Sequence, residues 1–289
     1  MYMAERSLRG DLSSSFGSED CEFAVAHCNF GLRGKESDGD EQFVLEWCEK
    51  HKDRIRCLYR QRPDAAGYAS EHGVSIEMAA RELRYSFFRD ICIIHGYDAV
   101  AVAHNADDNA ETLLLNMLRG CGTRGLRGMS PDSGEYPLRI IRPLLGVPRA
   151  EIRAWMEAEG LSWREDSTNA ESYFKRNKLR NKVMPVFAEI NPSYLRTLAA
   201  DMERFAQVDD IAEDYYRQAL EVCVLPDGAI DLKKVVTFKH WEYLLFRFTE
   251  GRLNADGLLR LKKSVESGRP LGGKIFGPYK VRKGKLRLI

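Results

Sequence analysis

Long apolar runs and paired cysteines are two features that this sequence lacks. No run among its 289 residues approaches the about 20 apolar residues that a transmembrane helix needs. Residues 1–20 contain no apolar core and so do not match a secretory signal peptide. We therefore expect a soluble, cytoplasmic protein with no membrane partner.

The cysteine pattern excludes further classes. There are seven cysteines, an odd number, and none forms a Cys-x-x-Cys pair. This argues against a zinc site or a disulfide framework and favours a reducing compartment.

The formal net charge of +1 argues neither for nor against nucleic acid. Lysine and arginine are nevertheless concentrated in residues 119–153, 174–182 and 260–287, which predicts a basic face on a neutral protein.

Apolar periodicity predicts an α/β fold. Strands are expected at residues 21–28, 54–59, 97–103 and 140–145, and helices at 41–51, 75–95, 109–118 and 149–159. Alternating strands and helices indicate a parallel sheet flanked by helices. The helix at 75–95 should bury one apolar side: Ile76, Ala79, Ala80, Leu83, Phe87, Ile91 and Ile94.

The second half of the chain predicts a smaller domain. A long helix is expected at 191–220, a helical module around Trp241–Phe248, and a strand pair at 274–289 with a turn at Lys283-Gly284. We divide the chain into an atypical N-terminal segment at 1–20, a nucleotide-binding domain at 21–205, and a small, mostly helical domain at 206–289 that contacts substrate or tRNA.

Residues 103–129 form the most informative stretch. Asp107, Asp108 and Glu111 follow a predicted strand and begin a helix. Three carboxylates so close together repel one another unless a metal ion or a cationic ligand lies between them. The alternative is a helix start with acidic residues that interact with the positive end of the helix dipole.

Other polar segments also follow predicted strands. One begins at His27 and another at Arg142, and ligands of parallel sheets bind at such strand ends. This arrangement predicts a nucleotide crevice, although His27 by itself is more typical of a structural histidine.

Two basic groups lie on predicted helices. Arg81 and Arg84 share a helix face and suit a polyphosphate, unless Glu77 and Glu82 pair with them at the surface. A second group lies near residues 176–182, after a polar stretch at 166–169, and suits phosphate or tRNA backbone or is a generic basic surface.

Five segments occur in an order that resembles the tRNA(Ile)-lysidine synthetase family. They are NFGLRGKESDGDE, EMAARELRY, AHNADDNAETLLLNMLRGCGTRGLRGM, IRPLLGVPRAEI and DSTN followed by RNKLR. The resemblance implies an ATP pyrophosphatase fold similar to adenine-nucleotide α-hydrolases. It also implies that ATP adenylates the wobble cytidine of an isoleucine tRNA with a CAU anticodon, after which free L-lysine displaces AMP.

The resemblance assigns site residues one by one. It implies catalytic roles for Asp108, Glu111, Arg84 and Arg176, with Mg²⁺ held by Asp108 and Glu111. It places ATP near Ala26, His27, Arg81, His104 and Asp107. We expect RNA contacts from Arg119, Arg124, Arg127, Arg180 and Lys182. Family members commonly pair, so a homodimer is compatible with the resemblance.

Two parts of the family pattern are absent from this sequence. The Ser-Gly-Gly-x-Asp-Ser loop, which binds pyrophosphate, has only the weak counterpart SFGSED at 15–20, and the strand before it is missing. The family also continues into a C-terminal module beyond residue 289. The alternatives are therefore a catalytically inactive, truncated tRNA-binding remnant and a sulfur-inserting tRNA enzyme, which the unpaired cysteines disfavour.

Overall fold

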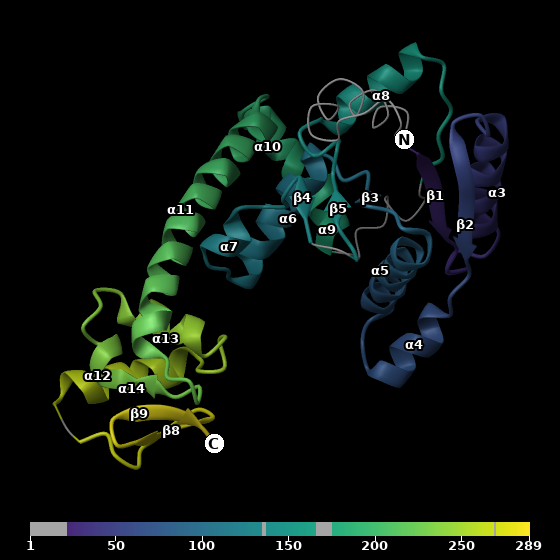
Figure 1. The fold of residues 1–289 in the computed structure, drawn as a ribbon. Helices are drawn as coiled ribbons and strands as arrows, with labels where there is room; N and C mark the ends of the chain where they lie inside the picture. The colour runs from purple at the N-terminus through teal and green to yellow at the C-terminus, as the bar shows by residue number, and fades with distance from the viewer. Residues whose placement is uncertain (1–21, 135–136, 166–174, 269) are drawn as a thin grey trace. The chain divides into compact units, whose positions relative to one another are not determined.

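The computed structural model describes residues 22–134, 137–165, 175–268 and 270–289 (Figure 1). The chain divides into two compact units, Met1–Met202 and Glu203–Ile289. The sequence-based boundary lay three residues later. The expected counterpart of the phosphate loop at 15–20 and the polar stretch at 166–169 lie outside the described residues, so the prediction of a missing first strand stays a prediction.

Parallel strand pairs form the framework of the first unit. Strand β1 (Phe23–Cys28) pairs in parallel with β2 (Ile55–Gln61), and α3 (Lys35–Lys50) connects them. Strand β3 (Val100–Ala101) pairs in parallel with β5 (Ile140–Ile141), whose other edge carries the antiparallel strand β4 (Asp132–Ser133). The predicted parallel arrangement flanked by helices is thus confirmed (Figure 1).

Helix α5 (Ile76–His95) shows how local sequence sets an element's limits. The Ser75 hydroxyl accepts a hydrogen bond from the Met78 amide at 3.2 Å, and Gly96 ends the helix at φ 72°. The expected burial of Ile76 and Ile94 is wrong, because they are 47% and 71% exposed. The helical period centres the buried side on Phe88, Ile91 and Cys92, which leaves both isoleucines at its margin.

The remaining helices of this unit are short. They are α4 (Ala65–His72), α6 (Ala106–Arg119), α7 (Thr123–Leu126), α8 (Arg149–Ala158), α9 (Lys175–Lys178) and α10 (Met184–Ile190). A π-helical turn at Leu179–Val183 joins α9 to α10, and in it the Met184 amide donates to the Leu179 carbonyl. Leu179 and Met184 are both buried, although five positions separate them. The extra residue of a π turn keeps both on one side of the segment.

The second unit combines helices with a small sheet. Helix α11 (Tyr194–Cys223) crosses the boundary in the sequence; α12 (Leu232–Val235), α13 (Trp241–Phe248) and α14 (Ala255–Glu266) follow. The sheet order is β6 (Ile230–Asp231), β9 (Lys285–Leu288), β8 (Tyr279–Arg282), β7 (Ile275–Phe276). The predicted turn is present, with φ 50° at Lys283 and 75° at Gly284. The core of the second unit includes the fully buried Leu245, Leu253, Leu261, Val281 and Leu286.

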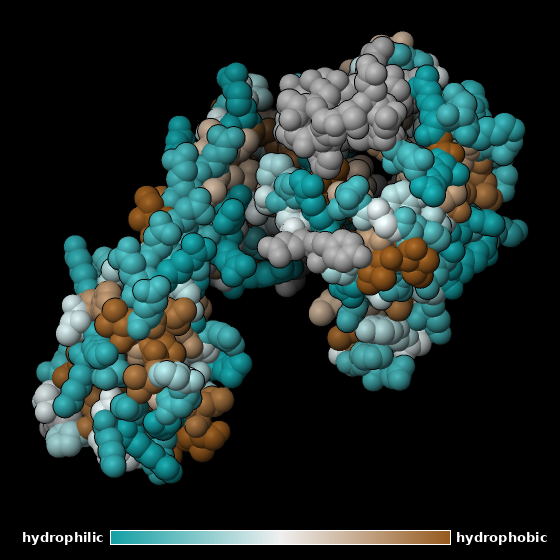
Figure 2. Space-filling view, viewed as in Figure 1, coloured by the Kyte–Doolittle hydropathy of each residue, from teal (hydrophilic) through white to brown (hydrophobic). Residues whose placement is uncertain are grey.

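The surface is largely hydrophilic on the face shown in Figure 2, where apolar side chains form separate patches. Among the described residues, no helix has both the length and the apolar character needed to cross a bilayer.

Candidate functional site

The N-terminus of α6 fixes the first acidic residues. The Asn105 side chain accepts from the Asp108 amide at 3.0 Å, and the Asp108 Oδ2 accepts from the Asn105 amide at 3.1 Å. This reciprocal capping box holds the Asp108 carboxylate in one orientation. Because the cap engages Oδ2, the other oxygen of Asp108, Oδ1, is left to contact residues outside α6.

Asp107 points in another direction. Its Oδ2 accepts from the Arg149 backbone amide at 2.8 Å, at the first residue of α8. A second contact, from the Ala106 amide to the Val147 carbonyl at 3.0 Å, supports the same junction. Asp107, which we expected near ATP, thus joins the starts of α6 and α8.

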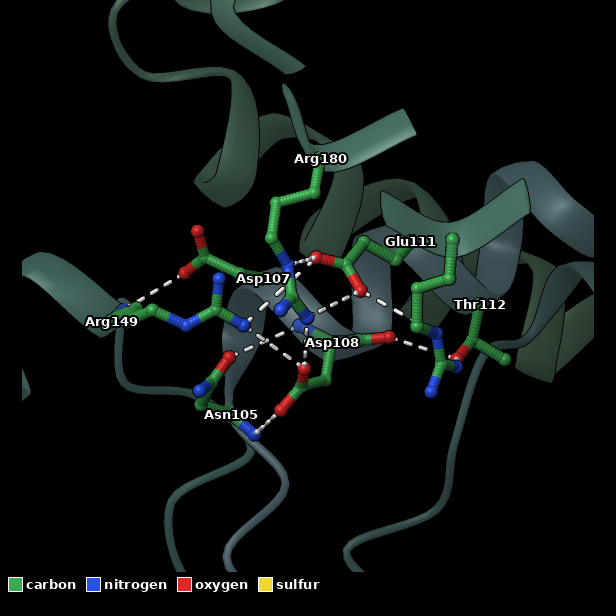
Figure 3. Close-up of polar contacts among 8 residues, drawn as sticks. Asn105, Asp107, Asp108, Glu111, Thr112, Arg149 and Arg180 are labelled. Atoms are coloured by element: carbon green, nitrogen blue, oxygen red, sulfur yellow. Dashed lines mark hydrogen bonds and ion pairs between the residues drawn. The ribbon is translucent and has the colours of Figure 1, made fainter. Parts of the chain in front are cut away.

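Two acids and three arginines converge beside this junction (Figure 3). We call Asp108, Glu111, Arg149, Arg176 and Arg180 the acid–arginine cluster. Arg180 donates from Nε to Glu111 Oε1 at 2.7 Å and from Nη2 to Oε2 at 3.0 Å. Its Nη2 also lies 3.4 Å from Asp108 Oδ1, to which Arg149 Nη2 donates at 3.0 Å. The cluster therefore links α6, α8 and the π-helical turn.

Arg176 completes the cluster from α9. Its Nε lies 3.4 Å from Glu111 Oε2, and its Nη2 donates to the Thr112 hydroxyl at 3.0 Å. The structure thus brings together Asp108, Glu111 and Arg176, three of the four residues for which we expected catalytic roles.

Burial differs sharply within the cluster. The Glu111 side chain is 1% exposed, Asp108 16% and Arg176 43%. Burial alone lowers the pKa of Arg180, but its hydrogen bond to Glu111 and the charges of Glu111 and Asp108 outweigh burial and raise that pKa. Arg180 therefore remains cationic, and three guanidinium groups surround two carboxylates.

This arrangement does not fit the Mg²⁺ ion that we expected at Asp108 and Glu111. Both Glu111 oxygens and both Asp108 oxygens already accept hydrogen bonds from nitrogen donors. Mg²⁺ requires open carboxylate oxygens and retains several waters, whereas three arginines repel a divalent cation. Among the described residues, no group of three or more His, Cys, Asp or Glu side chains is placed to hold a metal ion.

His104 lies next to the cluster, after β3. Burial lowers its pKa, the charges of Arg142, Arg176 and Arg81 lower it further, and Asp108 opposes them. The imidazole is therefore neutral at pH 7. Arg81 stacks over the Tyr85 ring at 4.6 Å. His104 and Arg81, both expected near ATP, thus belong to one neighbourhood.

The end of β1 forms a second polar region. His27 lines a cavity of about 710 Å³ together with Trp47 and Trp155, and its pKa is lowered by burial. Beyond it, the buried Asn29 amide donates to Glu41 at 2.8 Å and holds the following loop. Neither His27 nor its neighbour Ala26 forms a hydrogen bond or ion pair with the acid–arginine cluster in the described part of the chain.

Arg84 is also separate from the cluster. Its guanidinium lies over the Phe30 ring at 5.5 Å. Within the described ranges, neither Arg81 nor Arg84 forms an ion pair with Glu77 or Glu82, so the alternative of a Glu-paired surface does not describe them. Burial raises the pKa of nearby Cys28 to about 11, although Arg84 opposes this shift. Its thiol is therefore protonated at neutral pH.

The residues expected to contact RNA divide into two sets. Arg119, Arg124 and Lys182 are exposed, and Arg127 is half-buried. Arg180 instead points into the acid–arginine cluster, because both of its donor edges meet carboxylates. As the structure places it, Arg180 holds the cluster together, and its expected contact with RNA stays a prediction.

Arg149 is the cluster residue that sequence reasoning missed. It occupies the first position of α8, where the helix dipole disfavours a cation. That unfavourable placement was the available signal, since it implies an acidic partner elsewhere in the fold.

The chain is similar to a protein family and to several known proteins. The PP-loop domain family matches residues 8–187. The tRNA(Ile)-lysidine synthase of Parabacteroides distasonis is 40% identical over 220 residues, which cover 76% of this chain and 49% of that protein. The enzyme of the same name from Bacteroides thetaiotaomicron is 41% identical over 208 residues, covering 72% of this chain and 47% of that one. The chain thus spans about half the length of these relatives.

A solved structure shares the fold. It is the U34-tRNA thiolase NcsA from Methanococcus maripaludis with its 4Fe–4S cluster. The TM-score is 0.54 at 15% identity, over 71% of this chain and 69% of that one. At this identity the likeness concerns the fold alone.

Proposed function

Because the chain belongs to the PP-loop domain family, we propose that it catalyses the reaction named for its lysidine synthase relatives. In this reaction ATP adenylates the wobble cytidine of an isoleucine tRNA with a CAU anticodon and releases pyrophosphate. The amine of free L-lysine then attacks the activated base, and AMP leaves.

The acid–arginine cluster is the observation that carries the proposal. Asp108 is the more exposed of its two acids, and a capping box fixes its direction. Its Oδ1 accepts from Arg149 at 3.0 Å, so the ammonium group of lysine has to displace that donor to reach the carboxylate. Once there, the Asp108 carboxylate can accept the proton that the amine must lose before it attacks. Glu111 is buried and holds Arg180 in place by accepting two hydrogen bonds from it.

The arginines suit the phosphate side of the reaction. Arg176 is the most exposed guanidinium of the cluster, and Arg81 and Arg84 carry no acidic partner among the described residues. ATP, when bound, supplies the activating adenylate, and guanidinium groups placed at its phosphates stabilise the charge that develops there. This assignment makes Arg84, Arg81 and Arg176 phosphate ligands.

The test measures both half-reactions. Purified chain is incubated with ATP, L-lysine and isoleucine tRNA, and pyrophosphate release and lysine incorporation are followed separately. We expect both in the wild type and neither with tRNA that lacks the CAU anticodon. Binding of tRNA without pyrophosphate release would overturn the proposal and support an inactive tRNA-binding protein.

The second unit supports RNA contact on its own. Arg260, Lys263 and Lys274 line a pocket of about 360 Å³, and no acid pairs with Lys263 or Lys274 in the described part of the unit. Cations arranged in this way suit a phosphodiester backbone. In Lys263→Gln/Lys274→Gln, tRNA affinity should fall and depend less steeply on salt, whereas Lys52→Gln, in the first unit, should leave both unchanged. Equal salt slopes in all three proteins would remove this unit from the interface.

A homodimer remains part of the proposal, because paired copies are common in the resembling family. Sedimentation equilibrium of the chain tests this directly. A single species of monomer mass at micromolar concentration would contradict it.

A further inference from the structure

Four buried side-chain nitrogens of the described residues lack a hydrogen-bond partner, and three of them lie in one region. They are His104 Nδ1, Arg142 Nε and Arg176 Nε; the fourth is His27 Nε2. Buried polar groups are almost always hydrogen bonded in proteins. Arg176 Nε still faces a carboxylate, because it lies 3.4 Å from Glu111 Oε2. His104 Nδ1 and Arg142 Nε therefore carry the argument, and together they indicate a polar partner that the described residues do not provide.

The sheet brings two of these groups together. Ala101 and Ile141 are paired neighbours on β3 and β5, and the Val102 amide donates to the Ile141 carbonyl at 3.0 Å. Arg142 therefore follows β5 at the level where Val102 and then His104 follow β3. Both residues leave the carboxyl ends of adjacent parallel strands, where ligands of such sheets bind.

Arg142 is anchored but not neutralised. Its Nη1 donates to the Ser130 carbonyl and to the Ser133 hydroxyl, each at 2.7 Å. The nearby Asp132 is already engaged by Arg139, whose Nε lies 3.0 Å from both carboxylate oxygens. The two serine contacts fix one edge of the Arg142 guanidinium and leave Nε without a partner.

Several positive charges gather in this region, and in the described part of the chain neither Arg142 nor Arg81 forms an ion pair with an acid. Burial lowers the pKa of Arg142 and the charge of Arg81 lowers it further, whereas Tyr85 and Asp132 oppose this shift. Arg176 also acts on His104, so three guanidinium groups lie near one neutral imidazole. Like charges collected in a partly buried place are stabilised when an anion joins them.

We propose that Arg142 is a direct ligand of a phosphate group of the nucleotide, with Arg81 and His104 as its neighbours in the same oxyanion site. This inference rests on the proposed function, in that it takes ATP as the nucleotide. Arg142 contributes Nε as a charge-assisted donor, and the neutral His104 ring contributes a second hydrogen bond. Ser130 and Ser133 position Arg142 without contacting the ligand.

Calorimetric binding of three probes tests the inference: ATP, inorganic pyrophosphate and adenosine. In Arg142→Gln, affinity for ATP and for pyrophosphate should fall about 10- to 100-fold, as expected for loss of a charge-assisted hydrogen bond. Affinity for adenosine should not change. The matched control is Arg89→Gln, which removes an exposed arginine from the same helix as Arg81 and should leave all three affinities unchanged.

Two further variants keep the result interpretable. If Arg142→Gln lowers the thermal midpoint, Arg142→Lys retains the charge but lacks Nε, and it should still bind pyrophosphate at least about fivefold more weakly. Ser133→Ala removes an anchor only and should weaken pyrophosphate binding less than either Arg142 variant. Equal weakening in Ser133→Ala and Arg142→Gln would assign Arg142 a structural role and overturn the inference.

The outcomes separate this inference from the proposed function. ATP binding within twofold of wild type in a folded Arg142→Gln protein would overturn the inference alone. A wild-type chain that binds neither ATP nor pyrophosphate would overturn both. If Arg142→Gln weakens tRNA binding but not ATP binding, the site takes an RNA phosphate and the nucleotide assignment is wrong.

Discussion

Arg180 and Glu111 meet edge to edge, with Nε–Oε1 at 2.7 Å and Nη2–Oε2 at 3.0 Å. The two residues are 69 positions apart in the sequence. This contact fastens the π-helical turn to α6, so it connects the acids of the site to the segment that carries Arg176.

Removing one partner of this pair should destabilise the first unit. In Arg180→Met, the 1% exposed Glu111 carboxylate loses its two-point donor, and we expect the free energy of unfolding to fall by about 3 kcal/mol. Urea denaturation measures the change. The control, Glu151→Gln, alters an exposed acid of α8 and should cost less than about 0.5 kcal/mol. A loss below 1 kcal/mol in Arg180→Met would show that the other arginines suffice.

Substitutions of Asp108 and Glu111 should differ in their effects on lysine kinetics and on stability. Asp108→Asn keeps an oxygen for the capping box but removes the charge and turns an amide NH2 toward the Arg149 donor. KM for lysine should therefore rise at least about tenfold, with a smaller loss of stability than in Glu111→Gln. Glu111→Gln should lower stability as well as lysine transfer, because its buried partners lose a carboxylate. Steady-state kinetics and urea denaturation of the two variants make the comparison, with Asp98→Asn as an exposed control. Normal lysine kinetics in Asp108→Asn would remove this residue from the lysine site.

The cap of α6 should contribute measurably by itself. Asn105→Ala removes the acceptor for the Asp108 amide, and such losses cost about 1 kcal/mol. Chemical denaturation would detect this, and Asn105→Asp, which retains a capping oxygen, should recover most of the loss. Failure of Asn105→Asp to recover stability would point to a different role for this buried residue.

Stability of the first unit should fall as the pH drops below about 6.5. Burial lowers the pKa values of His27 and His104, and neighbouring arginines add to the shift of His104. The unfolded chain therefore binds more protons than the folded chain just below pH 6.5, which favours unfolding. Carboxylates with lowered pKa values, such as Glu41, lose their stabilising effect only at lower pH.

Thermal midpoints between pH 7.5 and 5.5 measure this dependence. The double variant His27→Gln/His104→Gln should show a flatter profile than the wild type, and the exposed His72→Gln should not. A wild-type midpoint that is constant over this range would contradict the assigned directions.

Sequence reasoning identified elements better than it identified their partners. Asp107, Asp108 and Glu111 were expected at the start of a helix, and the structure places all three in the first two turns of α6. Arg176 was assigned through the resemblance and lies in the cluster. Arg180 lies four residues later on the same basic segment, and spacing alone did not reveal that it would turn toward acids from α6 rather than toward solvent.

Elements with weak periodicity were missed or misjudged. Helix α4 has only eight residues, five of them Ala, Gly or Ser, and was not predicted. The strands predicted at 97–103 and 140–145 shrink to two residues each, because only Val100–Ala101 and Ile140–Ile141 pair. In the second unit, strands of two to four residues gave too little alternation for the four-stranded sheet to be expected.

The π-helical turn at Leu179–Val183 has a consequence for how this gene can change. Leu179 and Met184 are both buried only because the turn holds one residue more than an ordinary helix. A one-codon deletion there would convert the π-helical turn into an ordinary α-helical turn, and α10 would then be rotated about the helix axis relative to α9. Natural variants should therefore keep constant the number of residues between these two buried anchors.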